Sequence, residues 1–156
     1  MTETNASNFP GVQIMIPHLV VKDTRAAIAF YQKAFGAIEQ ICMMTPDGAG
    51  VMYAEVKIGN FSLALNDEFP DWEVRSPLSL QGSPVTLHLQ VEDADVWFER
   101  AIAAGATVSM PLENMFWGDR YGKLVDPFGH HWAIATQIEQ LTPEEITQRA
   151  ATAFAA

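Results

Sequence analysis

The sequence has 156 residues, 49% of them apolar, and a formal net charge of −10 from nine Lys and Arg against nineteen Asp and Glu. This length allows one compact unit or two very small ones. The acidic balance argues against binding to nucleic acids or to an anionic membrane surface, because both need basic residues. The single cysteine, Cys42, and the lack of a secretory signal or of a long apolar run indicate a cytoplasmic protein.

Residues 12–66 predict a first module with the element order β-α-β-β-β, behind a segment, residues 1–11, that we expect to be flexible. Residues 12–21 are typical of a strand. The helix after this strand begins with a cap at Asp23 and ends at Gly36. Three further strands are expected at 37–45, 51–58 and 61–66.

A second module is expected because the first pattern returns 70 residues later. The segment IPHLVVKD, residues 16–23, matches TLHLQVED, residues 86–93. A repeat that continues from strand through helix to hairpin indicates a duplicated structural unit. The sequence therefore predicts an α+β fold of two tandem βαβββ modules, 12–66 and 83–136, that form a cleft.

The segments outside the modules have different signals. Residues 67–82 have no sustained hydrophobic period and contain two prolines, which is typical of a linker. Residues 137–156 predict a helical tail, since Thr142 is a capping residue, Pro143 takes the first helical position and Glu145 the third. The elements expected in the second module are a strand at 84–91, a helix over 93–104, a strand at 106–112, an aromatic loop and a hairpin over 119–136.

Strand alternation predicts one polar sheet face in each module. In the strand at 84–91 apolar and polar residues alternate, and the apolar row must pack under the helix. We expect two-residue turns at Gly59-Asn60 and Pro127-Phe128. Such turns fix which residues of the two hairpin strands pair, and so which side chains share the polar face. The predicted polar faces contain His18, Tyr53, Glu55, Asn66, Thr86, His88, Gln90, Arg120 and His131. They either line one ligand-binding cleft, or form a solvated surface or a polar layer between the modules.

Loop and charged residues add further candidates. Phe116 and Trp117 form either a stacking wall for a planar ligand, or a hydrophobic plug or dimer contact. Arg120 either orients an anionic ligand group or makes a structural ion pair, with Asp119, Glu55 or Glu113 as partner.

These motifs resemble the vicinal oxygen chelate superfamily, which includes glyoxalase I, bleomycin-resistance proteins, fosfomycin-resistance proteins and extradiol dioxygenases. The resemblance rests on the tandem modules and on Asp-Pro-x-Gly, residues 126–129, before the last strand. Residues 115–136, MFWGDRYGKLVDPFGHHWAIAT, and residues 141–146, LTPEEI, resemble the PhnB-like group within it. The resemblance covers residues 12–146.

The resemblance also bears on metals. Metal-dependent members place their ligands at positions that here fall on Ile16, Ala64, Thr86 and Ala133. Only Thr86 has a donor atom, so the resemblance implies no metal and no cofactor. It implies instead a protein that sequesters a small organic molecule in an aromatic cleft, as bleomycin-resistance proteins do. The alternative is a metal-dependent lyase or isomerase of the glyoxalase I type, with displaced ligands His18, Glu55 and His88.

The sequence thus predicts a ligand-binding site and identifies no catalytic residue. A homodimer is expected, because each module has a small sheet with an open edge, and sheet edges are normally paired or covered. The predicted ligand-binding residues are His18, Tyr53, Glu55, His88, Phe116, Trp117, Arg120 and His131.

Overall fold

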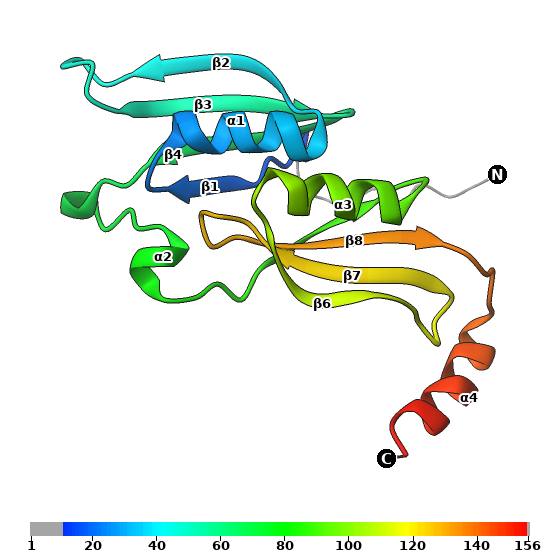
Figure 1. The fold of residues 1–156 in the computed structure, drawn as a ribbon. Helices are drawn as coiled ribbons and strands as arrows, with labels where there is room; N and C mark the ends of the chain where they lie inside the picture. The colour runs from blue at the N-terminus through cyan, green and yellow to red at the C-terminus, as the bar shows by residue number, and fades with distance from the viewer. Residues whose placement is uncertain (1–10, 156) are drawn as a thin grey trace.

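The chain folds into two four-stranded sheets, each with one long helix (Figure 1). The structure, a computed structural model, describes residues 11–155; the expected flexible segment therefore lies outside the described residues, apart from Gly11. The first module contains β1 (His18–Val21), α1 (Thr24–Phe35), β2 (Ile38–Met44), β3 (Val51–Ile58) and β4 (Phe61–Asp67). The second contains β5 (Thr86–Gln90), α3 (Ala94–Ala104), β6 (Thr107–Asn114), β7 (Asp119–Val125) and β8 (His131–Gln137).

The two sheets have the same topology, which confirms the predicted α+β fold of two βαβββ repeats. Their strand orders are β1-β4-β3-β2 and β5-β8-β7-β6. In each sheet the first and last strands of the module run parallel, and the other pairs are antiparallel. The helices also begin alike, because the side chains of Asp23 and Asp93 each accept a hydrogen bond from a backbone N–H in the first turn.

The last strand of each module holds the start of its helix by a second contact. Asp67 Oδ1 accepts a hydrogen bond from the backbone N–H of Thr24 at 2.8 Å. Thr136 Oγ1 accepts one from the N–H of Ala94 at 2.7 Å. These donors are among the groups that a helix cannot satisfy internally, so strand and helix are joined at equivalent points in both modules.

Both long helices lie between the two sheets and pack against each other. The core contains buried side chains from both modules, centred on aromatic rings. The Phe35 ring of α1 lies 4.6 Å from Trp132 of β8 and 6.1 Å from Trp97 of α3, measured between ring centroids. Each sheet therefore buries one face against the helices and leaves its other face open, and the packed helices separate the two open faces.

The carboxylate of Asp126, in the turn between β7 and β8, joins the two modules. Its Oδ2 accepts hydrogen bonds from the Tyr31 hydroxyl at 2.5 Å and from the Trp132 indole N–H at 2.9 Å. Its Oδ1 accepts from the backbone N–H groups of Phe128 at 2.9 Å and His130 at 3.0 Å. Burial, and then the Asp126 carboxylate, raise the pKa of Tyr31 well above its usual range.

The remaining segments are short. Residues 68–80, expected to be part of a linker, contain η1 (Pro70–Trp72) and α2 (Pro77–Leu80). The tail contains α4 (Pro143–Ala153), which begins with the predicted capping box between Thr142 and Glu145. Within residues 11–155, no helix has the length and apolar character that crossing a bilayer requires.

The contact between Tyr31 and Asp126 makes a prediction about alkaline stability. The unfolding free energy should fall above about pH 10, because the folded chain keeps Tyr31 protonated while the unfolded chain ionises it near its ordinary pKa. The contribution is thus present below that pH and is lost as the pH rises. Tyr31→Phe should lower the free energy by about 1–3 kcal/mol at pH 7 and should show a smaller alkaline fall. Urea unfolding of the wild type and of Tyr31→Phe, at pH 7 and above about pH 10, measures both effects.

Tyr121→Phe is the matched control, because Tyr121 lies on an open sheet face and should keep the wild-type behaviour. An alkaline fall of the same size in Tyr31→Phe and in the wild type would contradict the assignment.

Candidate functional site

The open face of the first sheet, called the first face, carries His18, Tyr53, Glu55, Ala64 and Asn66. The predicted turn at Gly59-Asn60 is confirmed, because Ile58 pairs with Phe61. The register across the sheet then places His18 beside Ala64 and Ala64 beside Glu55. Paired residues in neighbouring strands point to the same side. His18, Ala64 and Glu55 therefore form a row in which a methyl group separates an imidazole from a carboxylate.

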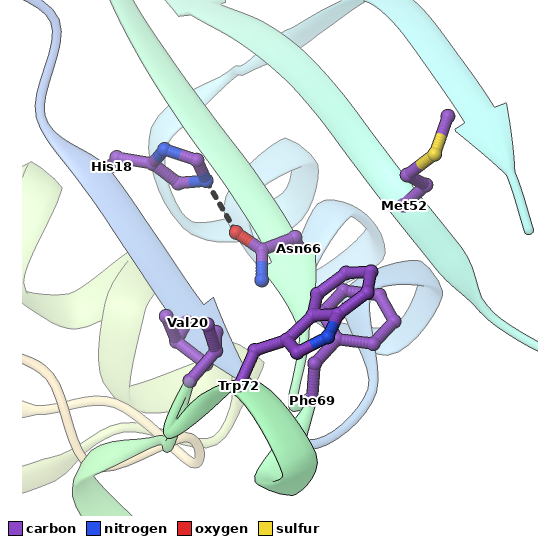
Figure 2. A pocket seen from close by; sticks show the side chains of 7 residues that line it. His18, Val20, Met52, Asn66, Phe69 and Trp72 are labelled. Atoms are coloured by element: carbon purple, nitrogen blue, oxygen red, sulfur yellow. Dashed lines mark hydrogen bonds between the residues drawn. The ribbon is translucent and has the colours of Figure 1, made fainter.

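A hollow of about 350 Å³ lies at one end of the first face. Figure 2 shows side chains from three strands around it, with two aromatic rings from the segment that follows β4. A bulge in β3 contributes, because Met44 pairs with Val51 and Met43 with Tyr53, which leaves Met52 as an extra residue. The lining residues are His18, Val20, Met52, Asn66, Phe69, Trp72 and Val74.

Polar groups on the first face are linked by short hydrogen bonds. Asn66 Nδ2 donates to the backbone carbonyl of Asp67 at 2.6 Å, which orients the amide so that its Oδ1 meets Nε2 of His18. The Tyr53 hydroxyl donates to Glu55 Oε2 at 3.1 Å. Desolvation, and then this contact with Glu55, raise the pKa of Tyr53. The rings of His18 and Tyr53 meet edge to face at 5.8 Å.

The two aromatic rings of the hollow are carried by an arm, residues 68–80. Phe69 and Trp72 lie 5.7 Å apart between ring centroids, and Trp72 is 77% exposed. Glu68 fixes the base of the arm: its Oε1 accepts from the backbone N–H of Ser76 at 2.8 Å and from the hydroxyls of Ser76 and Ser79 at 2.5 Å. These bonds lower the pKa of Glu68 to about 2.

The open face of the second sheet, called the second face, repeats this arrangement with one difference. His88 pairs with Ala133, and Ala133 with Lys123, so His88, Ala133 and Lys123 form the equivalent row. A lysine thus occupies the place that Glu55 has on the first face. Both charged side chains are half-buried.

Each face also has a cluster of a histidine, a tyrosine and an amide. On the second face, Nε2 of His88 lies 3.0 Å from Gln90 Oε1, and the His88 ring lies 5.9 Å from the Tyr121 ring. Tyr121 in turn contacts Trp117, with 5.4 Å between ring centroids. His131, the neighbour of Thr86 in the sheet, lies on the same face.

The placement predicted for Arg120 on the polar face is wrong. The turn between β7 and β8 is longer than two residues, since Val125 pairs with His131, and Arg120 pairs with Thr136 instead of Ala135. A shift of one residue moves every side chain of a strand to the other face. Arg120 points to the helix side and binds Asp95 of α3 with two N···O distances of 2.7 and 2.8 Å. It makes a structural ion pair, with a partner outside the predicted set.

The other predicted residues occupy three places. His18, Tyr53 and Glu55 lie on the first face, and His88, His131 and Trp117 lie on or beside the second. Phe116 packs on Trp117 and on Phe154, just after α4. Sequence reasoning missed Met52, Tyr121 and Lys123. The repeated pattern Tyr-x-charged, Tyr53 to Glu55 and Tyr121 to Lys123, is the signal that would have found the last two.

A single chain does not bring the two faces together in one cleft, because the helix layer lies between them. His18 and Glu55 are therefore separated from His88. Within residues 11–155 of one chain, no three His, Cys, Asp or Glu side chains gather where they would hold a metal ion. The metal-ligand positions implied by the resemblance in the last strands are Ala64 and Ala133, which are buried methyl groups without a donor atom. These positions do not fit a metal.

Comparison with known proteins agrees with this architecture. The chain matches the glyoxalase/bleomycin resistance protein/dioxygenase superfamily over residues 12–134 and therefore belongs to it. An uncharacterized protein of Mycobacterium bovis is 47% identical over 133 residues, which cover 83% of this chain and 87% of that protein.

Solved structures share the fold. A gene product of Arabidopsis thaliana, 29% identical, superposes with a TM-score of 0.65 over 80% of this chain and 99% of its own. The fosfomycin resistance protein of Listeria monocytogenes, solved with Mn(II) and sulfate, gives 0.64 at 19% identity, over 90% of this chain and 99% of that one. At this identity the second likeness concerns the fold alone.

The Glu68 contacts predict how the arm responds to acid. Because the pKa of Glu68 is lowered, Glu68 stabilises the arm fully above its ordinary pKa of about 4.5. This stabilisation is lost as the pH falls through about 2. Glu68→Gln should speed hydrogen exchange of the Ser76 amide up to about fivefold at neutral pH, a modest effect because the contact is only partly buried. The ratio of exchange rates between variant and wild type should approach one in acid.

Glu73→Gln is the control for this measurement, since Glu73 lies on the same arm with an exposed side chain. Equal exchange in Glu68→Gln and wild type at pH 7 would show that Glu68 does not hold the arm.

Proposed function

We propose that this protein binds a small organic molecule in a cleft that two copies of the chain form together. The observation that carries this proposal is the helix layer between the sheets, which keeps the first and second faces of one chain apart. Each face alone is half of a site. In a two-fold dimer, the first face of one subunit would lie opposite the second face of its partner, and the dimer would hold two such clefts.

Exposed apolar side chains support an interface on these faces. Ile41 pairs with Glu55 and Met43 with Tyr53, so both lie on the first face, and both are exposed. On the second face Met110 pairs with Lys123 and is also exposed. Apolar side chains gathered around polar groups on an open sheet are typical of an interaction surface. The hollow with Trp72 and the ring of Trp117 then supply stacking area for a planar ligand.

We further propose that the protein belongs to the PhnB-like group and acts in the cytoplasm. The tryptophan-containing segment 115–136 supports the group, and the single cysteine supports a reducing compartment.

The second candidate function is a metal-dependent lyase or isomerase of the glyoxalase type. One observation favours it: His18 and Glu55 lie on the first face and His88 on the second, so the proposed dimer would bring these three side chains to one cleft. The binding function is preferred because Ala64 and Ala133 replace the family's ligands.

Mixed dimers test the composite cleft. Trp72→Ala alters the first face and Trp117→Ala the second, and each homodimer should bind a planar aromatic compound about tenfold more weakly or worse, because stacking area is lost. A heterodimer of the two variants, purified through two different tags, should contain one wild-type cleft and one cleft with both substitutions. It should therefore bind one equivalent with wild-type affinity in isothermal titration against a panel of aromatic antibiotics and glutathione conjugates.

Phe61→Ala is the control, since this exposed ring lies on neither face. A heterodimer as weak as both homodimers would place the site within one chain. A mass of 17.2 kDa by light scattering at micromolar concentration would exclude the dimer itself.

Metal analysis separates the two candidate functions. The purified protein should carry no stoichiometric Zn, Ni, Mn or Fe, because three of the four ligand positions, Ile16, Ala64 and Ala133, lack donor atoms. Elemental analysis after dialysis measures this. About one tightly held metal ion per chain, lost in His88→Ala, would contradict the binding function and favour the lyase.

A further inference from the structure

We infer that the site takes a zwitterionic ligand, with a cationic group beside Glu55 on the first face and an anionic group beside Lys123 on the second. This inference rests on the composite cleft proposed above. It starts from the two equivalent rows, His18–Ala64–Glu55 and His88–Ala133–Lys123, which differ in the sign of the charge at one end.

The two charges occupy equivalent positions on the open faces. Glu55 and Lys123 both stand on the third strand of their module, two residues after a tyrosine, and opposite an alanine on the last strand. The alanines are buried, at 2% and 0% exposure, so each lies beneath the side chains that flank it in its row. A duplicated site that kept the histidine, tyrosine and alanine but reversed the charge presents opposite charges to one molecule.

The first face is suited to a cationic or hydrogen-bond-donating group. Two of its side-chain donors are already engaged: Asn66 Nδ2 donates to a backbone carbonyl, and the Tyr53 hydroxyl donates to Glu55. Because Asn66 Oδ1 meets Nε2 of His18, neutral His18 carries its proton on Nε2 and offers the Nδ1 lone pair. Around His18 and Tyr53, the groups left for a ligand are thus acceptors. Lys57, on the same face, lies further along β3, away from the hollow at Met52.

On the second face, the position equivalent to Glu55 carries the opposite charge. Lys123 is half-buried, and within the described residues of one chain it forms no ion pair. Arg120, the cation expected there, is engaged by Asp95 on the helix side. Lys123 is therefore the basic group of this row, and it can pair with a carboxylate or another anionic group. The alternative is that Lys123 forms an ion pair with Glu55 of the partner subunit across the dimer interface, instead of binding a ligand.

Three dansyl compounds that share one planar ring system test this inference. Nε-dansyl-lysine is a zwitterion, dansylcadaverine carries only an ammonium group, and dansylglycine carries only a carboxylate. The zwitterion should bind the dimer about fivefold or more tighter than either other compound, because it makes both charge contacts. Dansyl fluorescence in titrations with the full chain measures the three affinities.

Single substitutions test which side chain binds the ammonium group of a probe and which binds its carboxylate. Glu55→Gln should weaken Nε-dansyl-lysine and dansylcadaverine and leave dansylglycine unchanged. Lys123→Met should weaken Nε-dansyl-lysine and dansylglycine and leave dansylcadaverine unchanged. Glu99→Gln, on an exposed part of α3, makes the same change in net charge as Glu55→Gln and should leave all three unchanged. Circular dichroism confirms that each variant is folded.

Two results would overturn the zwitterion and leave the proposed function intact. In the first, binding depends on Trp72, but the three compounds bind with equal affinity, or neither Glu55→Gln nor Lys123→Met changes the affinity of any of them. In the second, Glu55→Gln and Lys123→Met each dissociate the dimer without any probe present. This would show that Glu55 and Lys123 of the two subunits pair directly with each other. Failure of all three compounds to bind the wild type, together with a failed heterodimer test, would overturn both the inference and the composite cleft.

Discussion

The structure depends on the buried carboxylate of Asp126. Its four hydrogen bonds satisfy two backbone N–H groups of the turn, an indole of β8 and a hydroxyl of α1. The contacts within the turn hold it at a length that sets the register of β7 against β8. The contact to Tyr31 holds the second module against the helix of the first. The pairing of the strands and the packing of the modules are therefore fixed at one point, and the orientation of the open faces follows from both.

Much of the fold was predictable from the sequence, because local signals and the internal repeat agree. The caps at Asp23 and Thr142 mark helix starts through hydrogen bonds that the sequence alone implies. The turn at Gly59-Asn60 gave the correct register, since its two residues fit a tight hairpin. The turn after β7 looked equally tight, but Asp126 accepts bonds from N–H groups two and four residues later, which stabilise a longer loop. Such a side-chain effect has no periodic signature.

The candidate site was predictable only in part. Alternation placed His18, Glu55 and His88 correctly on the polar faces, because it depends on strand geometry alone. It failed for Arg120, where the register had shifted. The hollow depends on a bulge at Met52 and on an arm held by Glu68, and neither leaves a regular pattern in the sequence. The separation of the two faces is a property of how helices pack between sheets, which no single module encodes.

The helix layer has a consequence for how this chain can change. A side chain on the first face touches solvent on one side and its own sheet on the other, with the second sheet beyond two packed helices. Within one chain, substitutions on the two faces should be additive in stability, since they share no contact through the helix layer. After the duplication, each face was thus free to acquire its own chemistry without disturbing its twin, as the exchange of a glutamate for a lysine at equivalent positions illustrates.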